Sequence, residues 1–203
     1  MKIGVVDYEA GNLRSVETAL EAVEADYLVS DRPEPLLDTD RLVFPGVGDA
    51  KAAMTVLERS GLADAVRRFF GEGKLILGIC VGSQIVLDAS EENDAQCLGL
   101  IPGTARRFPG DMGLKVPHMG WNQVTDIEGH PLFEGIPSGT SFYFVHSYYP
   151  EPTRPEHRIA TTEYGIEFAA GVGRENLMAV QFHPEKSGEA GLRLLRNFIS
   201  LPE

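Results

Sequence analysis

The sequence predicts a single α/β domain in which helices flank a central, mostly parallel sheet, with more strands in its second half. Short apolar segments alternate with amphipathic ones through the first half of the chain, a pattern typical of βαβ units. With 203 residues, 43% of them hydrophobic, the chain is long enough to bury one substantial core. No repeat, low-complexity tract or linker divides it, so we expect one domain over residues 1–203.

The first half alternates predicted strands and helices. Residues 3–7, IGVVD, read as a buried strand, and apolar residues from Leu13 to Val23 then recur at helical spacing. Asn12 precedes that helix and is expected to cap its N-terminus. The remaining predicted elements are strands at 26–30, 41–44 and 74–79, helices at 50–58 and 62–70, and a loop at 31–35.

The second half is richer in strands. Residues 140–149, TSFYFVHSYY, carry aromatic side chains on both faces, as expected of a central strand. A surface loop is expected at 150–156, and strands follow at 157–164, 166–173 and 176–185 with hairpin-like spacing. The chain closes with an amphipathic helix at 187–201, with Leu192, Leu195 and Ile199 along one stripe.

Composition excludes several classes of function. The formal net charge is −12, with 30 acidic against 18 basic residues, so we expect neither nucleic acid nor a membrane as partner. No apolar segment approaches the roughly 20 residues of a membrane-spanning helix, and the N-terminus lacks the pattern of a signal peptide, so we expect a cytoplasmic protein. Only two cysteines are present, Cys80 and Cys97, outside any metal-binding pattern, so we expect no metal site.

Cys80 follows a predicted strand in the segment LILGICVGSQIVL (75–87). In parallel α/β sheets, catalytic groups gather at the carboxyl ends of strands. Gly78 and Gly82 flank the cysteine, which resembles the G-x-S-x-G nucleophile elbow with sulfur in place of oxygen. Residues without a Cβ relieve the crowding where a strand turns sharply into a helix. The alternative is an inert core thiol, since free cysteine is among the most buried residue types.

A reactive thiol also needs a base, because the dipole of a helix N-terminus leaves it mostly protonated at neutral pH. Of the five histidines, only His183 ends an apolar strand beside a carboxylate, in AVQFHPEKS. In an extended segment His183 and Glu185 point to the same side, so the carboxylate can orient the imidazole. The alternative for this short string is a solvated turn.

The segment FPGVGDA (44–50) follows another predicted strand. Gly46 and Gly48 leave backbone N–H groups that can point outward, and such donors stabilise an oxyanion. A dinucleotide-binding loop is not favoured, since the G-x-G string is not completed before the helix. We expect an oxyanion hole here, although a plain strand-to-helix turn fits the same residues.

The strings PGVG, GICVGSQ and FHPEKS, in this order and spacing, resemble the class I, triad-type glutamine amidotransferases. KVPHMGWN (115–122) and FYFVHSYY (142–149) narrow the resemblance to the glutaminase subunits of imidazole glycerol phosphate synthase, in histidine biosynthesis. The resemblance spans essentially the whole chain. Val81 and Ser83 stand where this family usually has Leu and Met, and neither change removes a catalytic group.

The resemblance implies glutamine hydrolysis, without a cofactor, by a triad of Cys80, His183 and Glu185. Cys80 would attack the side-chain amide of glutamine to form a γ-glutamyl thioester. His183 would protonate the departing ammonia and then activate water, while Glu185 orients it. The implied oxyanion-hole residues are Val47, Gly48 and Val81. The implied glutamine-binding residues are Gly48, Gln84, Glu92, Ser147 and Tyr148.

The chain offers no second substrate domain to use the ammonia, and the resemblance implies a separate (β/α)₈-barrel cyclase in a heterodimer. That subunit would form imidazole glycerol phosphate and aminoimidazole carboxamide ribotide. The candidate docking residues are Pro117, His118, Met119, Gly120, Trp121, Asn122, Tyr143, His146 and Lys186. Tyr143 could equally be a core aromatic and Lys186 a solvated charge. We also expect the free chain to hydrolyse glutamine poorly, because the glycine-rich PGVG turn could flip a peptide when the partner binds.

Three rival functions are less well supported. The glutaminase of pyridoxal phosphate synthesis would carry a G-G-E-S-type string in place of PGVG. A purely hydrolytic cysteine enzyme of related fold would not need the string PHMGWN. A non-catalytic binding subunit is disfavoured because Cys80, His183 and Glu185 are all intact.

Overall fold

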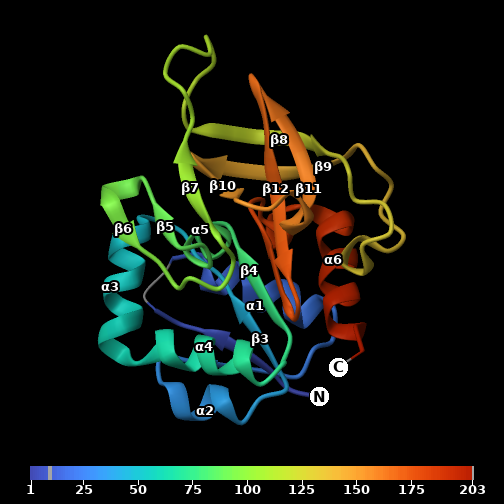
Figure 1. The fold of residues 1–203 in the computed structure, drawn as a ribbon. Helices are drawn as coiled ribbons and strands as arrows, with labels where there is room; N and C mark the ends of the chain where they lie inside the picture. Colours follow the sequence, from blue (N-terminus) through green and yellow to red (C-terminus); the bar gives the residue numbers. More distant parts are fainter. Residues whose placement is uncertain (9–10, 203) are drawn as a thin grey trace.

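Seven strands form the central sheet of the computed structural model, which describes residues 1–8 and 11–202. Their order across the sheet is β11-β12-β13-β4-β3-β1-β2 (Figure 1). The five strands from β13 to β2 run parallel, and β12 runs antiparallel to both of its neighbours. The strands are β1 (Ile3–Val6), β2 (Tyr27–Ser30), β3 (Arg41–Phe44), β4 (Ile76–Ile79), β11 (Arg158–Tyr164), β12 (Ile166–Arg174) and β13 (Leu177–Val180). The predicted α/β class and mostly parallel sheet are therefore confirmed.

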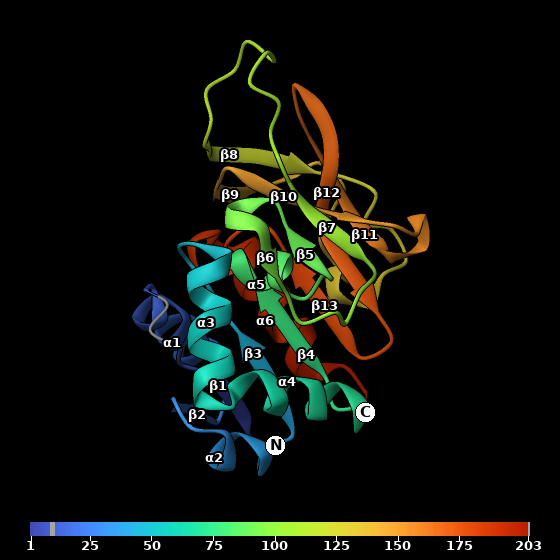
Figure 2. The same cartoon turned by 60° about the vertical axis from the view of Figure 1, so that its left-hand side comes forward.

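Helices cover both faces of this sheet. Helices α1 and α6 pack together on one face, and α3 packs with α4 and α5 on the other, as Figure 2 shows from a second direction. Strands β1, β3, β4 and β13 are buried along their whole length, because these helices exclude water from both sides. The α-helices are α1 (Leu13–Ala22), α2 (Pro33–Leu37), α3 (Ala50–Ser60), α4 (Leu62–Gly71), α5 (Val81–Ile85) and α6 (Gly188–Ser200). No helix within the described residues is long and apolar enough to cross a bilayer.

Two small sheets lie beyond the carboxyl end of β4 (Figure 1). One has the order β10-β7-β5-β6, and the other is the antiparallel pair β8-β9. Their strands are β5 (Ala89–Ser90), β6 (Ala95–Gln96), β7 (Gly103–Arg107), β8 (His118–Val124), β9 (Thr140–His146) and β10 (Tyr148–Pro152). Four short 3-10 helices complete the structure: η1 (Glu92–Asp94), η2 (Pro131–Phe133), η3 (Pro155–His157) and η4 (Pro184–Lys186).

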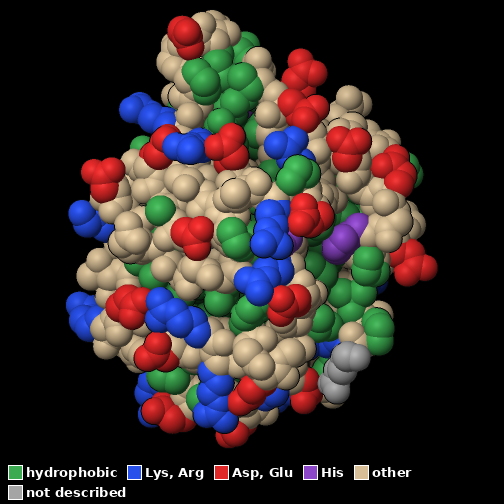
Figure 3. All heavy atoms as spheres, in the orientation of Figure 1, with side chains coloured by type: hydrophobic (Ala, Val, Ile, Leu, Met, Phe, Trp, Pro, Cys, Tyr) green, Lys and Arg blue, Asp and Glu red, His purple; other side chains and the backbone are tan. Residues whose placement is uncertain are grey.

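Acidic side chains are spread over the surface of the protein. On the face drawn in Figure 3, acidic and basic side chains are interspersed, so the acidic excess forms no continuous patch there. Hydrophobic side chains gather over the connection between β7 and β8 at the top of that view, where Leu114 is 45% exposed.

Three predictions about local structure were wrong. Residues 31–35 were expected to be a loop, but α2 begins at Pro33, because proline at the first helical position loses no hydrogen bond. Residues 140–149 do not form one central strand: the chain divides at Ser147 into β9 and β10, which belong to different sheets. Strand β10 also occupies the start of the predicted loop at 150–156, because it pairs with β7.

The buried stripe of the last helix is also displaced from its prediction. In α6 the fully buried side chains include Leu194, Leu195 and Phe198, whereas Leu192 and Ile199 are only half-buried. The helix is thus rotated toward Leu194, and only Leu195 belongs to both the predicted and the observed stripe.

Candidate active site

Cys80 forms a sharp turn between β4 and α5. Its backbone has φ 53° and ψ −109°, a conformation that L-residues rarely adopt. A Cβ on Gly78 would lie 2.9 Å from the Cβ of Ala179, and a Cβ on Gly82 would meet the carbonyl oxygen of Phe44. Both flanking glycines are therefore required by close packing, and Cys80 carries the strain of the turn, as expected of an elbow.

The sulfur of Cys80 lies among polar groups despite its burial. The residue is 3% exposed, and its Sγ lies 3.8 Å from the side-chain nitrogen of Gln181 and 4.0 Å from the carbonyl oxygen of Val145. An inert core thiol would have apolar neighbours only. The surroundings of this sulfur instead favour a polar role.

Strand β13 brings His183 to the cysteine. It lies beside β4 in parallel register, and the backbone N–H of Cys80 donates to the carbonyl of Val180 at 2.8 Å. The chain then continues three residues to His183, and this brings the imidazole close enough to the Cys80 side chain for that side chain to raise its pKa. Residues far apart in sequence thus meet because their strands are neighbours in the sheet.

A buried carboxylate and an amide lie behind the imidazole. His183 Nδ1 lies 2.6 Å from Glu185 Oε1, and the same oxygen accepts a hydrogen bond from Asn12 Nδ2 at 2.5 Å. The side chains of His183 and Glu185 are 1% and 0% exposed. Because the carboxylate accepts a proton on Nδ1, Nε2 is the nitrogen left to act on the sulfur, and it has no hydrogen-bond partner within the described chain.

The pKa of His183 is strongly perturbed. Burial lowers the pKa, but the Cys80 side chain and the Glu185 carboxylate both favour the charged imidazole and raise the pKa to about 10. A titratable group perturbed by a specific partner at a cavity is a candidate for acid–base chemistry.

The PGVG turn lies next to the Cys80 elbow. Its Gly46 carbonyl occupies one of the backbone N–H groups that were predicted to stabilise the oxyanion. Gly48 has φ 104°, which favours glycine, so its peptide has an orientation that few other residues would allow. The backbone N–H of Val81 donates to the carbonyl of Gly46 at 3.3 Å. One of the three predicted oxyanion donors is therefore occupied by the turn itself.

A cavity of about 270 Å³ opens above the sulfur. It brings together Cys80 and every predicted oxyanion and glutamine-binding residue, whereas His183 and Glu185 do not line it. The lining residues are Val47, Gly48, Cys80, Val81, Gln84, Glu92, Pro117, Val145, His146, Ser147 and Tyr148.

Two polar side chains of this cavity are already held by the protein. Gln84 Nε2 donates to the carbonyl of Tyr148 and to Gln181 Oε1, both at 3.0 Å. Glu92 Oε2 accepts from the backbone N–H of Ala50 at 2.7 Å. Burial raises the pKa of Glu92, the Ala50 hydrogen bond lowers it, and the charge of Asp49 adds to the increase.

The predicted docking residues do not all lie at the surface. Met119 and Trp121 are 62% and 60% exposed on the outer face of β8, and Lys186 places its ammonium 6.0 Å from the ring centre of the half-buried Tyr143. His118 and His146 were expected at this face, and that expectation was wrong. Residues alternate across a strand, and these two point inward and are 3% and 5% exposed. Pro117 is exposed, and Gly120 and Asn122 are intermediate.

Sequence reasoning missed three residues near the sulfur. Gln181 precedes His183 by two positions on an extended segment, so strand alternation alone could have placed it on the same side. Asn12 was predicted as a helix cap, but its side chain makes no capping hydrogen bond and binds Glu185 instead. Tyr8 has a buried hydroxyl without a partner among the described residues, packed against Gly46; burial, and then the charge of Cys80, raise its pKa.

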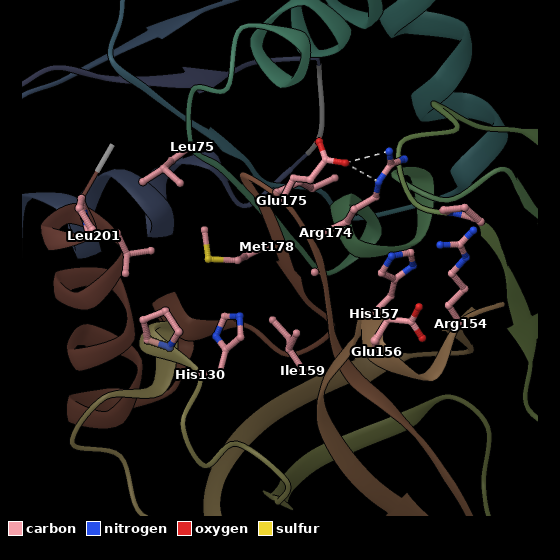
Figure 4. A pocket seen from close by; sticks show the side chains of 15 residues that line it. Leu75, His130, Arg154, Glu156, His157, Ile159, Arg174, Glu175, Met178 and Leu201 are labelled. Carbon is pink, nitrogen blue, oxygen red and sulfur yellow. Dashed lines mark hydrogen bonds and ion pairs between the residues drawn. The ribbon is translucent and has the colours of Figure 1, made fainter.

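A larger cavity of about 760 Å³ lies at the opposite end of the sheet (Figure 4). Leu75 and Leu177 line it where β4 and β13 begin, whereas Cys80 lies where β4 ends. Its Arg174 is paired with Glu175 at 2.9 Å, and its lining contains no cysteine, serine or lysine. Size therefore does not identify the candidate site here, because the predicted nucleophile Cys80 lines the smaller cavity.

Comparisons with known proteins show the family to which the chain belongs. Residues 4–201 match the family model described as "Glutamine amidotransferase class-I". The "Imidazole glycerol phosphate synthase subunit HisH" of Dehalococcoides mccartyi is 44% identical, over 98% of this chain and 97% of its own. The protein of the same name from Gloeobacter violaceus is 47% identical, over 97% of this chain and 88% of its own.

Solved structures share the fold at low identity. A structure titled "Crystal structure of glutamine amidotransferase" has a TM-score of 0.72 at 24% identity, covering 97% of this chain and 96% of that one. "Structure of PurLQS from Thermotoga maritima" has a TM-score of 0.75 at 20% identity, covering 98% and 97%. At such identities the likeness is one of fold.

Proposed function

Because this chain belongs to the class I glutamine amidotransferase family, we propose that it is the glutaminase subunit of an imidazole glycerol phosphate synthase. It hydrolyses glutamine to glutamate and ammonia and passes the ammonia to a partner subunit in histidine biosynthesis. The observation that carries this proposal is the strained Cys80 at a cavity floor, backed by the buried pair of His183 and Glu185. Full-length relatives named for this synthase support it.

The first half of the reaction forms a thioester. His183, whose pKa is raised to about 10, already holds the thiol proton on Nε2, and the Cys80 sulfur attacks the carbon of the glutamine side-chain amide. The developing oxyanion is stabilised by backbone N–H groups of Val47, Gly48 and Val81, each such donor typically worth about 3 kcal/mol. The tetrahedral intermediate then breaks its C–N bond as His183 returns its proton to the leaving nitrogen, which releases ammonia.

The second half regenerates the enzyme. His183, again neutral, takes a proton from water, and the resulting hydroxide attacks the thioester carbon. The C–S bond breaks, the imidazolium keeps its proton beside the departing sulfur, and glutamate leaves. Glu185 accepts the hydrogen bond of Nδ1–H throughout, because its role is to hold that tautomer and to stabilise the imidazolium.

The glutamine head group is held by residues of the same cavity. Gly48, Ser147 and Tyr148 offer backbone groups there, and the Glu92 carboxylate faces the α-ammonium group of the substrate. Gln84 acts mainly by fixing Tyr148, since its side-chain nitrogen already donates to that carbonyl.

The partner is a (β/α)₈-barrel cyclase that uses ammonia to make imidazole glycerol phosphate and aminoimidazole carboxamide ribotide, in a cytoplasmic heterodimer. The docking surface on this chain is the outer face of the β8–β9 pair, with Met119, Trp121 and Tyr143, together with Lys186 of η4. Exposed aromatic and methionine side chains are enriched at protein interfaces, which supports this choice.

The free subunit is a poor glutaminase. The Val81 N–H binds the Gly46 carbonyl, so completing the oxyanion hole requires the turn to move. Partner binding supplies that movement. Equal glutaminase rates with and without the cyclase would contradict this part of the proposal.

Covalent labelling tests the whole proposal. A glutamine-mimicking diazoketone should add once to the wild-type chain, and peptide mapping should find it on Cys80. Cys97 is an internal control, because burial and the nearby Asp88 charge raise its pKa to about 12 and leave it unreactive. Cys80→Ala should lose glutamine-dependent synthesis in the complex but keep synthesis from ammonium salts. Labelling at Cys97, or loss of both activities in Cys80→Ala, would overturn the proposal.

A further inference from the structure

Two buried imidazoles lie between the outer strand β8 and the glutamine cavity. His118 on β8 and His146 on β9 are paired directly across the two-stranded sheet, and both are at most 5% exposed. They stack among aromatic rings, with Tyr164 4.0 Å and Phe144 4.9 Å from the His118 ring centre. The triad mechanism uses neither residue, although His146 lines the cavity.

The two rings belong to a continuous chain of hydrogen bonds. His146 Nδ1 lies 2.7 Å from the Tyr148 carbonyl oxygen, and His146 Nε2 lies 2.9 Å from His118 Nδ1. His118 Nε2 lies 3.3 Å from Asn122 Nδ2. Each of the four ring nitrogens of His118 and His146 therefore has a hydrogen-bond partner.

The groups at the two ends of this series of hydrogen bonds determine which atom donates in each one. A carbonyl oxygen only accepts, so His146 must carry its proton on Nδ1 and accept at Nε2. His118 must then donate from Nδ1 and accept at Nε2, and the amide nitrogen of Asn122 is a donor, as this requires. A single arrangement of protons, with both rings neutral and protonated on Nδ1, satisfies every member.

The same carbonyl joins this chain to the reactive sulfur. Tyr148 O also accepts from Gln84 Nε2 at 3.0 Å, and Gln84 Nε2 donates to Gln181 Oε1 at 3.0 Å. Gln181 Nε2 in turn lies 3.8 Å from Cys80 Sγ. The Tyr148 carbonyl is thus held from two sides, by an imidazole and by an amide.

We propose that His118 and His146 are positioning residues for glutamine, which hold the segment Ser147–Tyr148 in place as one chain of Nδ1–H tautomers. This inference rests on the proposed function, because it assigns the two histidines a part in binding that substrate. It also removes them from the docking face, where the sequence had suggested they would act.

The surroundings keep both rings neutral. Burial lowers the pKa of His118 to about 4. Burial lowers the pKa of His146 to about 3; the Tyr148 hydrogen bond opposes this, and the charges of His118 and His183 add to it. A second proton on either ring would sit on Nε2, where it would face an N–H group that already donates to that nitrogen. The arrangement with both imidazoles neutral is therefore the stable one.

Nuclear magnetic resonance of the wild-type chain tests the tautomers directly. In protein with nitrogen-labelled histidine, long-range proton–nitrogen correlations should show both rings protonated on Nδ1 and bare at Nε2 at neutral pH. Free histidine prefers the opposite tautomer, so this result would not arise by default. Either ring protonated on Nε2 would overturn the proposal.

Labelling kinetics test the positioning role. His118→Phe keeps a ring in the aromatic cluster but leaves His146 Nε2 without its donor, so the apparent dissociation constant of the glutamine-mimicking diazoketone should rise about tenfold. The maximal labelling rate and the reaction with iodoacetamide, which does not use the glutamine site, should be unchanged. His118→Asn, whose amide can replace Nδ1–H, should restore part of the affinity.

A matched core variant separates positioning from stability. Phe168→Leu disturbs the same aromatic cluster without touching the hydrogen-bond chain, so it should lower stability and keep the affinity for the diazoketone. A wild-type affinity in His118→Phe would overturn the positioning role while leaving the proposed function intact. Failure of wild-type Cys80 to be labelled at all would instead overturn the proposed function, and this inference with it.

Discussion

The side-chain amide of Asn12 donates a hydrogen bond of 2.5 Å to the Glu185 carboxylate, although the two residues are 173 positions apart. The same carboxylate oxygen accepts from His183 at 2.6 Å. The start of α1 therefore supports the imidazole from behind, and the site draws on the first and last parts of the chain.

Removing this amide should slow catalysis. In Asn12→Ala, Glu185 loses one of its two donors and holds the imidazole less firmly, so kcat should fall about tenfold with KM nearly unchanged. The free energy of unfolding should fall by about 1–3 kcal/mol, since a buried acceptor is left short of a partner. Steady-state kinetics of the complex and urea unfolding measure the two effects.

Asn197→Ala is the control for that variant. Asn197 donates to the backbone carbonyls of Leu132 and Glu134, far from the sulfur, so its loss should lower stability without changing kcat. Similar kcat values in the two variants would contradict a specific role for Asn12.

The stability of the chain should depend on alkaline pH through His183. Its pKa is raised in the folded state from 6.5 to about 10, so its stabilising contribution is complete below about pH 6.5 and is lost as pH rises through about 10. Between about pH 7 and about pH 10, the unfolding free energy of the wild type should fall relative to that of His183→Gln. A difference between the two proteins that stays constant over this range would refute the assignment.

The elbow should not tolerate a side chain at Gly82. A Cβ there meets the Phe44 carbonyl oxygen, so Gly82→Ala should cost about 3 kcal/mol of unfolding free energy and abolish diazoketone labelling of Cys80. At Gly71, at the end of α4, a Cβ meets nothing within 4 Å, so Gly71→Ala should stabilise the chain by about 0.5–1 kcal/mol. Wild-type labelling and stability in Gly82→Ala would show that the turn has room to adjust.

The outer face of β8 should carry the affinity for the partner. Trp121 is 60% exposed, and replacing an aromatic anchor by alanine typically costs about 2 kcal/mol of binding, so Trp121→Ala should weaken the complex about 30-fold. Thermal unfolding of the free chain should not change. Arg67→Ala, on α4 at the other end of the molecule, is the control and should bind normally. Equal affinity of the two variants would move the docking surface elsewhere.

Local patterns predicted the parallel part of the fold well. The strand at 41–44 was placed correctly, because the consecutive apolar residues 42–44 are typical of a strand that is buried on both faces. Helix α2 escaped prediction because two prolines suggest a loop, although proline suits a first helical turn. The division between β9 and β10 has no local signal, since it depends on which distant strand each half pairs with.

The parts of the candidate site that depend on local sequence could also be predicted, whereas those that depend on distant contacts could not. The elbow, His183 and Glu185 could be proposed from short motifs because strand ends gather at one edge of a sheet. His118 and His146 were misplaced although alternation along β8 and β9 already separates them from Met119 and Trp121. The role of Asn12 could not be predicted, because it depends on how α1 meets η4.

The central position of β13, between β4 and β12, sets when the protein can begin to work during its synthesis. The ribosome delivers Cys80 and its glycine turns about one hundred residues before the strand that fills the middle of the sheet and leads to His183. A nascent or C-terminally shortened chain therefore carries a thiol without a base. We therefore expect a polypeptide that lacks β13 to hydrolyse no glutamine, because completing the sheet also completes the candidate active site.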